Sequence, residues 1–191
     1  PVEIVVFKNP NVAESVAFEN AVKDIAAIAP EKLKFVSYNE GENKELEAKV
    51  KLTRTPSIAV LDKDGNFSGL KYSSLPSGHE LNSFILGLYN VAGPGQKVAP
   101  ESLEKIAKID KPINVKIGIS LSCTKCPKTV QATQRIATLN KNIEMEMINI
   151  FTFQDFKNRY DIMSVPAIII DDTHVHFGEK NVEDMIELLT K

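Results

Sequence analysis

The chain has 191 residues, of which 43% are hydrophobic and 25% are charged, and its formal net charge is −2. This balance excludes an intrinsically disordered chain, and the lack of a basic excess disfavours binding to nucleic acid. The longest uncharged run, residues 81–96, is interrupted by Asn, Ser, Gly and Pro, so no membrane span is predicted.

The first half of the chain is predicted to alternate between strands and helices. Short runs of β-branched and apolar residues predict strands at 2–7, 34–38, 57–61 and 67–72. Asp64-Gly65 between the last two runs is a hairpin signal. The charged stretch at 42–52 is predicted to be helical. Apolar residues at helical spacing predict two more helices, one with Val12, Val16, Val22, Ile25 and Ala29, and one with Leu81, Phe84, Ile85, Leu88 and Val91.

The second half repeats this order. The same patterns predict strands at 114–120, 144–150, 167–170 and 174–177, and helices at 123–139, 153–160 and 182–189. Thr55-Pro56 and Val165-Pro166 each lead into a strand and lie 110 residues apart. A βαβαββα order that occurs twice predicts an α/β chain made of two similar units with mixed sheets.

Gly93-Pro94-Gly95 marks the boundary between the units. We expect a first unit over 1–93, a connector over 94–112 with a helix at 101–109, and a second unit over 113–191. The connector is short, and its apolar residues have packing spacing, so we expect the units to pack as one rigid body. The glycines do not form a Gly-x-Gly-x-x-Gly fingerprint, so no flavin or nicotinamide site is expected on this chain.

The two cysteines, Cys123 and Cys126, form a CxxC pair between a predicted strand and a predicted helix. Backbone N–H groups and the helix dipole at this position favour a thiolate, and the intervening Thr124-Lys125 adds positive charge. We expect Cys123 to attack a substrate disulfide and Cys126, one turn inward, to resolve the mixed disulfide. A pair that cycles in this way favours a reducing cytoplasm as the compartment.

Two other interpretations of the cysteine pair stay open. The cysteines could be structural, or they could be half of a zinc site. Zinc normally takes four ligands, and the only candidate partners are His174 and His176, on a predicted strand far along the chain.

Val165-Pro166 ahead of a buried strand is the second candidate feature. A cis proline beside a CxxC pair would expose backbone groups that hold an incoming substrate strand, whereas a trans proline at a strand start would be structural. The corresponding place in the first unit, residues 8–12, has no cysteine, so that unit cannot exchange disulfides.

Besides the cysteine pair and the Val165-Pro166 bond, several short strings of residues, spread over nearly the whole chain, match a known family. They are Ser120-Leu121-Ser122-Cys123-x-x-Cys126-Pro127, Val130-Gln131-Ala132, Leu139-Asn140, Thr152-Phe153-Gln154, Val165-Pro166-Ala167, Phe177-Gly178 and, in the first unit, Pro76-x-Gly78-His79-Glu80. The second unit resembles thioredoxin and glutaredoxin folds, and the whole chain resembles the N-terminal domain of the alkyl hydroperoxide reductase flavoprotein subunit. The cysteine-free first repeat is a mark of that family, whereas archaeal protein disulfide oxidoreductases usually keep CxxC in both units.

The resemblance implies two tandem thioredoxin-like units that act as a thiol–disulfide oxidoreductase. Electrons would pass from a flavoprotein, thioredoxin-reductase-like module through the CxxC pair to the disulfide of a two-cysteine peroxiredoxin. FAD and NAD(P)H are then expected on a fused or separate reductase module, with no cofactor on this chain. The alternatives are a general protein disulfide oxidoreductase and a redox-inactive thioredoxin-like binding module.

The resemblance also implies a role for Glu80. In the family, the glutamate of Gly-His-Glu reaches from the first unit to the redox disulfide, so Glu80 would shuttle a proton to or from Cys126. The residues alone allow a second interpretation, in which Glu80 is an acid at the start of an apolar helix, stabilised there by the helix dipole.

Overall fold

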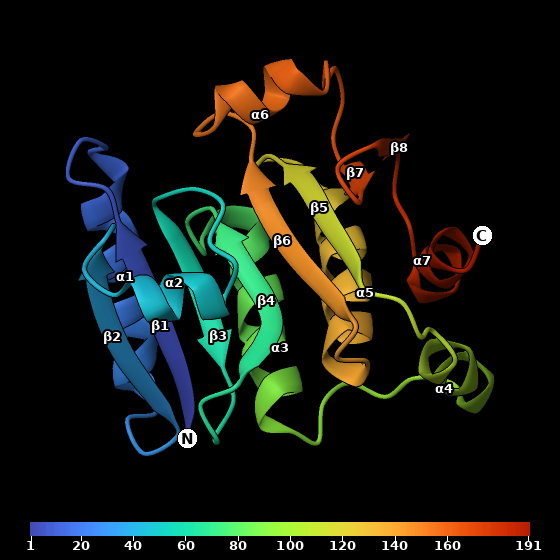
Figure 1. Ribbon diagram of the computed structural model, residues 1–191, viewed down its shortest axis with the longest axis horizontal. Coiled ribbons are helices and arrows are strands. Elements are labelled where there is room, and N and C mark those ends of the chain that lie inside the picture. Colours follow the sequence, from blue (N-terminus) through green and yellow to red (C-terminus); the bar gives the residue numbers. More distant parts are fainter.

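In the computed structural model, which describes residues 1–191, eight strands form one sheet in the order β2-β1-β3-β4-β6-β5-β7-β8 (Figure 1). Strands β3 and β7 run antiparallel to their neighbours, and β1, β2, β4, β5, β6 and β8 all run in one direction. The carboxyl ends of these six strands therefore lie at one edge of the sheet. The strands are β1 (Val2–Lys8), β2 (Leu33–Asn39), β3 (Ser57–Leu61), β4 (Phe67–Ser73), β5 (Ile113–Ile119), β6 (Ile143–Asn149), β7 (Ala167–Ile170) and β8 (His174–Phe177).

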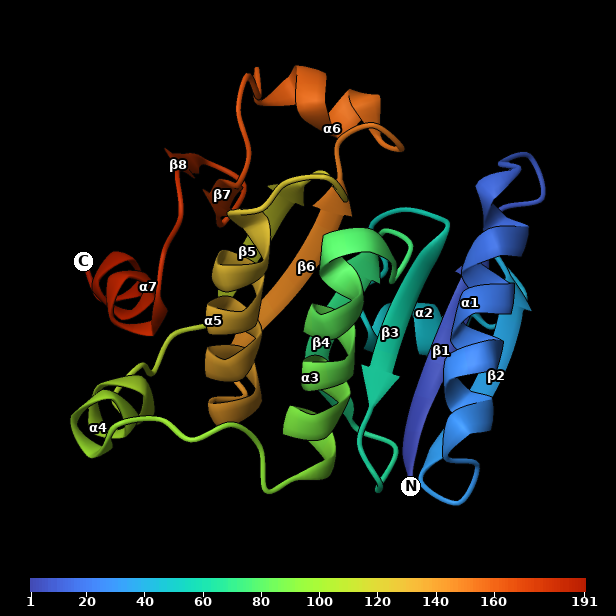
Figure 2. The same cartoon turned by 180° about the vertical axis from the view of Figure 1, so that it is seen from behind.

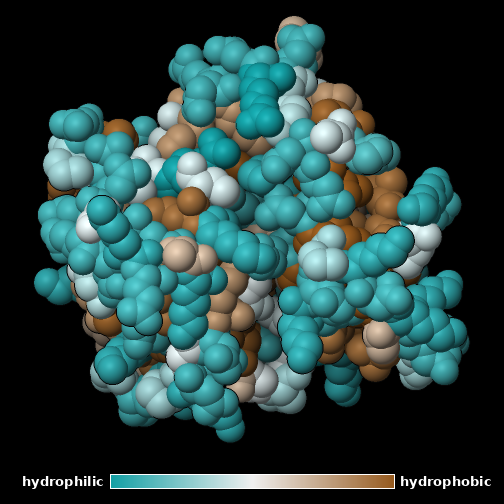
Figure 3. Space-filling view, in the orientation of Figure 1, coloured by the Kyte–Doolittle hydropathy of each residue, from teal (hydrophilic) through white to brown (hydrophobic).

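The helices cover the two faces of the sheet unequally. Figure 2 shows the face covered by α1 (Glu14–Ile28), α3 (Leu81–Ala92), α5 (Cys126–Leu139) and α7 (Val182–Leu189). The short helices α2 (Lys44–Lys49) and α6 (Gln154–Arg159) lie on the other side, where hydrophilic residues dominate the surface (Figure 3). Helix α4 (Pro100–Ala107) lies between the halves in the chain, and a 3-10 turn, η1 (Gly78–Glu80), precedes α3. None of the helices combines the length and the apolar character needed to cross a bilayer.

The predicted βαβαββα order occurs twice, which confirms the expected fold class. The halves share one continuous sheet, because Leu70–Ser73 of β4 pair in parallel with Met145–Ile148 of β6. One apolar cluster of 30 buried residues runs through both halves beneath α1, α3, α5 and α7. Two smaller clusters lie under α2 and α6 on the opposite face. The molecule is therefore one body with a common core.

A buried carboxylate joins the halves on the α2 and α6 side of the sheet. Glu146 of β6 is fully buried and accepts hydrogen bonds from Thr53 at 2.8 Å and Ser73 at 2.6 Å. Arg54 Nε lies 3.3 Å and Lys71 Nζ 3.8 Å from its oxygens. All four partners belong to the first half, so Glu146 neutralises cations across the β4–β6 junction.

Helix α5 begins at Cys126, so the prediction of a helix from residue 123 was wrong at its start. Pro127 gives the physical reason. In a helix that began at Cys123, the proline ring would lie where an N–H should bond the Cys123 carbonyl, whereas the first turn of a helix tolerates proline. Cys123 therefore lies on the turn before the helix.

Some residues predicted on apolar helix faces are exposed instead. Val16 is 64% exposed on α1, which buries Phe18, Val22 and Ile25. Leu81 and Ile85 on α3 and Leu103 on α4 are also exposed. These helices form an outer layer with nothing packed on top, so apolar residues beyond the inward stripe stay in water.

Candidate dithiol site

Cys123 and Cys126 form a disulfide at the sheet edge where β5 ends, with their Cα atoms 5.6 Å apart. Cys126 is fully buried as the first residue of α5, while Cys123 is half-buried. The backbone N–H of Cys126 donates to Cys123 Sγ at 3.1 Å. The reachable sulfur is therefore also the one that a backbone donor would stabilise as a thiolate.

Two serines shape the turn that carries the cysteines. The side chains of Ser120 and Ser122 are hydrogen-bonded at 3.0 Å, and the Cys123 N–H donates to the Ser120 carbonyl at 3.1 Å. These bonds let the chain leave β5 in a tight turn. Thr124 and Lys125 are exposed between the cysteines.

The Val165-Pro166 peptide bond is cis, as is Thr55-Pro56 at the corresponding place in the first half. The Val165 carbonyl oxygen lies 3.8 Å from Cys123 Sγ. The Gly178 N–H donates to the Pro166 carbonyl at 3.1 Å, which ties this loop to the end of β8. The structure therefore brings Val165 and Pro166 to the half-buried cysteine.

Turn η1 of the first half docks on the segment just before the cysteines. The His79 N–H donates to the Leu121 carbonyl at 3.1 Å. Gly78 has a φ of +56°, and a Cβ there would lie 2.9 Å from the same carbonyl oxygen. Glycine is needed at this position on both grounds, and the close contact places the next residues against the dithiol turn.

Glu80, which ends this turn, is completely buried. Its Oε1 accepts a hydrogen bond from Ser83 at 2.6 Å, and its Oε2 has no hydrogen-bond partner. Burial raises the pKa of Glu80 from 4.5 to about 7, and the Ser83 hydrogen bond acts in the opposite direction. The side chain makes no capping bond to α3, and a carboxyl with this pKa exchanges protons near neutrality.

Polar side chains of α5 hold Ser83. Gln131 belongs to the string Val130-Gln131-Ala132, but no role in the site was predicted for it or for Gln134. Gln131 Nε2 donates to Ser83 Oγ at 3.1 Å, and Gln134 Nε2 donates to the Ser83 carbonyl at 2.8 Å. The Tyr72 hydroxyl donates to Gln134 Oε1 at 2.6 Å. Two glutamines three residues apart on a helix were the available signal, because they lie on the same side of that helix.

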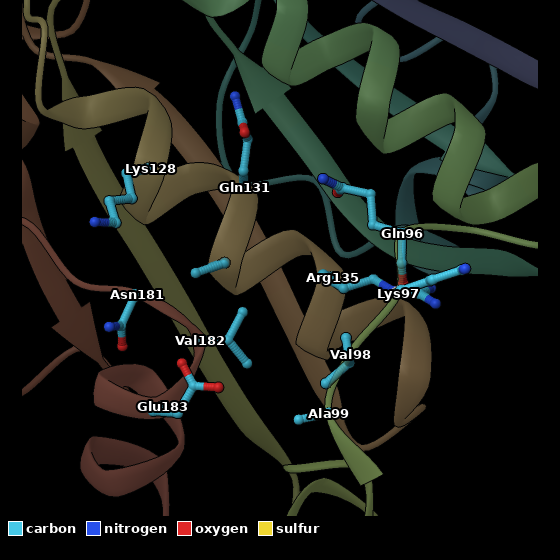
Figure 4. Close-up of a pocket in the computed structure, with 11 residues that line it drawn as sticks. Gln96, Lys97, Val98, Ala99, Lys128, Gln131, Arg135, Asn181, Val182 and Glu183 are labelled. Atoms are coloured by element: carbon cyan, nitrogen blue, oxygen red, sulfur yellow. The ribbon is translucent and has the colours of Figure 1, made fainter.

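A cavity of about 300 Å³ lies beside α5, between the 96–99 segment and the start of α7 (Figure 4). Lys128, Gln131 and Arg135 line it from α5. Arg135 Nε donates to the Gln96 carbonyl at 2.7 Å, so it ties the connecting segment to the helix. No group of three or more His, Cys, Asp or Glu side chains is arranged to hold a metal ion, and His174 and His176 lie on β8.

Comparison with known proteins identifies relatives of both halves. A family described as "Thioredoxin domain" matches residues 113–190. The F subunit of alkyl hydroperoxide reductase from Staphylococcus epidermidis is 33% identical over 138 residues, which are 72% of this chain and 27% of that protein. The chain therefore spans about a quarter of the length of the curated relatives it matches.

Solved structures match over nearly the whole chain. The alkylhydroperoxide reductase AhpF of Enterococcus faecalis has a TM-score of 0.93 and 34% identity, covering 98% of this chain and 89% of that one. The separately solved NTD_N/C domain of the same protein gives the same score and identity, with 98% and 90% covered. A protein disulfide oxidoreductase from Aeropyrum pernix shares the fold at a TM-score of 0.84, with 21% identity and 99% and 84% covered.

Proposed function

The chain belongs to the family of the N-terminal domain of the alkyl hydroperoxide reductase AhpF, and we propose that it relays electrons to the disulfide of a two-cysteine peroxiredoxin. It is a thiol–disulfide oxidoreductase of the thioredoxin fold. The observation that carries the proposal is the disulfide itself, with Cys123 half-buried and Cys126 buried. A flavoprotein reductase module, fused or separate, would reduce this disulfide. FAD and NAD(P)H would bind there, because this chain has no Gly-x-Gly-x-x-Gly fingerprint.

In the proposed exchange, the Cys123 thiolate attacks one sulfur of the partner's disulfide. That bond breaks, a mixed disulfide forms, and the released partner thiolate takes a proton. Cys126 then gives its proton to Glu80 and attacks Cys123 Sγ, which expels the second partner thiolate. Two electrons have moved to the partner, and the Cys123–Cys126 disulfide is restored for the reductase module.

Other residues of the site support this order of events. Burial and a free Oε2 suit Glu80 to take the Cys126 proton, because a carboxyl with a pKa of about 7 works as a general base near neutrality. We assign Thr124, Lys125, Val165 and Pro166 to the surface that the partner protein touches, since the first pair is exposed and the second lies at Cys123.

The proposal extends to the organisation and location of the chain. We propose units at 1–93 and 113–191, joined by a connector at 94–112 that contains α4. We also propose a reducing cytoplasm as the compartment. The dithiol must be reduced again in every cycle, and an oxidising environment would oppose that reduction.

Single cysteine variants test the relay. Cys126→Ser should accumulate a stable mixed disulfide between Cys123 and a two-cysteine peroxiredoxin, seen on non-reducing gels and by mass spectrometry. Cys123→Ser should form no adduct and should abolish reduction. If Cys126→Ser turned over normally, the assignment of the two sulfurs would be wrong. Equal rates with the peroxiredoxin and with unrelated protein disulfides would instead indicate a general disulfide oxidoreductase.

A further inference from the structure

The buried carboxyl of Glu80 is held by side chains from both halves of the molecule. Ser83, on α3, is fully buried and donates to Glu80 Oε1 at 2.6 Å. Gln131, on α5, donates to Ser83 Oγ at 3.1 Å, although the two residues lie 48 positions apart. A second glutamine of α5, Gln134, holds the backbone of Ser83 at 2.8 Å. The position of Ser83 is therefore set by the helix that begins with Cys126.

The hydrogen bonds of Ser83 define where its single proton points. A serine hydroxyl has one proton and two lone pairs. The Gln131 amide occupies one lone pair of Oγ, and the Ser83 proton is donated to Oε1 of Glu80. With this bond in place Oε1 is an acceptor, so the proton of neutral Glu80 lies on Oε2, the one buried side-chain oxygen without a partner.

We propose that Ser83 and Gln131 are positioning residues that hold the Glu80 proton on Oε2 and favour its release. This rests on the role proposed above for Glu80. A carboxyl with both oxygens free could place its proton on either one, so the proton would have no fixed position. The Gln131–Ser83 pair removes this ambiguity and keeps one oxygen available for proton transfer.

No charged side chain near Glu80 lowers its pKa in addition to this hydrogen bond. Ser83 is the one group that lowers the pKa of Glu80 against the effect of burial. Among the neighbouring elements, β4 contributes Tyr72, whose own pKa is raised by burial and then by the Glu80 charge. His79 on η1 is exposed, and α5 contributes Cys126, which is in the disulfide. No lysine or arginine therefore takes the part assigned to Ser83.

Gln131 also connects this pair to solvent. It lines the cavity beside α5, and in Figure 4 its side chain extends away from Val182 and Glu183 on the opposite side of the cavity. The amide is therefore held at one end by Ser83, while its helix carries the resolving cysteine five residues earlier.

The experiment follows the protonation of Glu80 directly and through activity. Difference infrared spectroscopy across pH records the carboxyl band of neutral Glu80, assigned by its loss in Glu80→Gln. Stopped-flow reduction of a peroxiredoxin disulfide is measured over the same range. Ser83→Ala should move both midpoints upward by about one pH unit, because a hydrogen bond to a charged group has been removed. Gln131→Met, which frees the Ser83 proton to rotate, should move them in the same direction by less.

A matched control separates this effect from the loss of any buried serine. Ser102 is also buried and donates to a glutamate, Glu183, at 3.3 Å, so Ser102→Ala should leave both midpoints unchanged. An infrared midpoint that stays in place in folded Ser83→Ala and Gln131→Met would overturn the inference. The role of Glu80 itself fails separately, if Glu80→Gln exchanges as fast as wild type instead of up to about 10²–10⁴-fold more slowly.

Discussion

Burial, rather than a neighbouring charge, raises the pKa of Glu80, and the same burial lowers the stability of the folded chain when Glu80 is charged. The pKa of Glu80 is about 7 in the folded chain and 4.5 when the group is in water. Between these two values the folded state binds more protons than the unfolded state, so stability falls as pH rises. Above pH 7 the full penalty applies, and it amounts to about 3 kcal/mol.

Glu80→Gln should therefore stabilise the protein at pH 8 and have little effect at about pH 3, where Glu80 is neutral in both the folded and the unfolded chain. Urea denaturation of the oxidised protein at the two pH values measures this difference. The gain at pH 8 should approach about 3 kcal/mol. A variant as stable as wild type at both pH values would mean that Glu80 keeps its ordinary pKa in the fold.

The sequence identified some site residues far better than others. Cys123 and Cys126 stand out because their spacing within the chain carries the chemistry. Glu80 could be suspected only through a resemblance, since its neighbours in the chain suggest a helix-start acid. The roles of Ser83 and Gln131 could not be assigned, because each depends on a contact with a residue of the other half. The spacing of Gln131 and Gln134 indicates that they share a side of the helix, but it does not indicate the partner there.

At the scale of elements, the contact between α3, α5 and β4 depends on a glycine, Gly87, which has no side chain to separate them. A Cβ at Gly87 of α3 would lie 2.2 Å from the Tyr72 hydroxyl oxygen and 3.1 Å from Gln134 Oε1. Helix propensity alone favours alanine over glycine by about 1 kcal/mol. The close approach reverses this preference, because the tyrosine is fully buried and its hydroxyl is hydrogen-bonded to Gln134.

Gly87→Ala should accordingly destabilise the protein, by about 1–3 kcal/mol, the range typical of overpacked cores. Tyr72→Phe removes the hydroxyl oxygen that clashes. A double variant that combines Gly87→Ala with Tyr72→Phe should therefore recover part of the lost stability. Thermal unfolding of the two single variants and the double variant measures this coupling. Greater stability in Gly87→Ala than in wild type would show that helix propensity dominates at this position.

Element types were largely predictable because periods of two and 3.6 residues are local properties of the chain. Element ends and exposed faces were less so. The predicted helix at 42–52 is found at Lys44–Lys49, and the one at 101–109 is found at Pro100–Ala107. Val16 and Ile85 match a helical period yet lie in water, because the period does not tell which helices lack an outer neighbour.

At the scale of the whole molecule, Glu146 is the group on which the junction between the halves depends. Arg54 reaches it from the first half, and the Arg54 guanidinium also lies 5.4 and 5.2 Å from the ring centres of Phe153 and Phe156. Burial lowers the pKa of Lys71, and the charge of Glu146 opposes that shift. The carboxylate therefore compensates two cations that have little access to water.

Glu146→Leu should destabilise the protein by about 3–5 kcal/mol, because it leaves buried cations without a counter-charge. Glu144→Gln is the matched control on the same strand, since Glu144 pairs at 2.9 Å with Lys51, whose side chain is 67% exposed. That change should cost less than about 1 kcal/mol. Chemical denaturation distinguishes the two, and similar losses would show that Glu146 has no special part in joining the halves.

The parallel pairing of β4 with β6 also determines what happens if the chain is divided. A fragment that begins near residue 113 would lose Leu70–Ser73, and the backbone donors and acceptors of Met145–Ile148 along that side would have no partners. Such a row of unpaired groups on a mostly apolar strand is a template for edge-to-edge association. An isolated second half would therefore tend to form oligomers or aggregates. By covering this edge of β6, the cysteine-free half also prevents the second half from associating with other copies of itself.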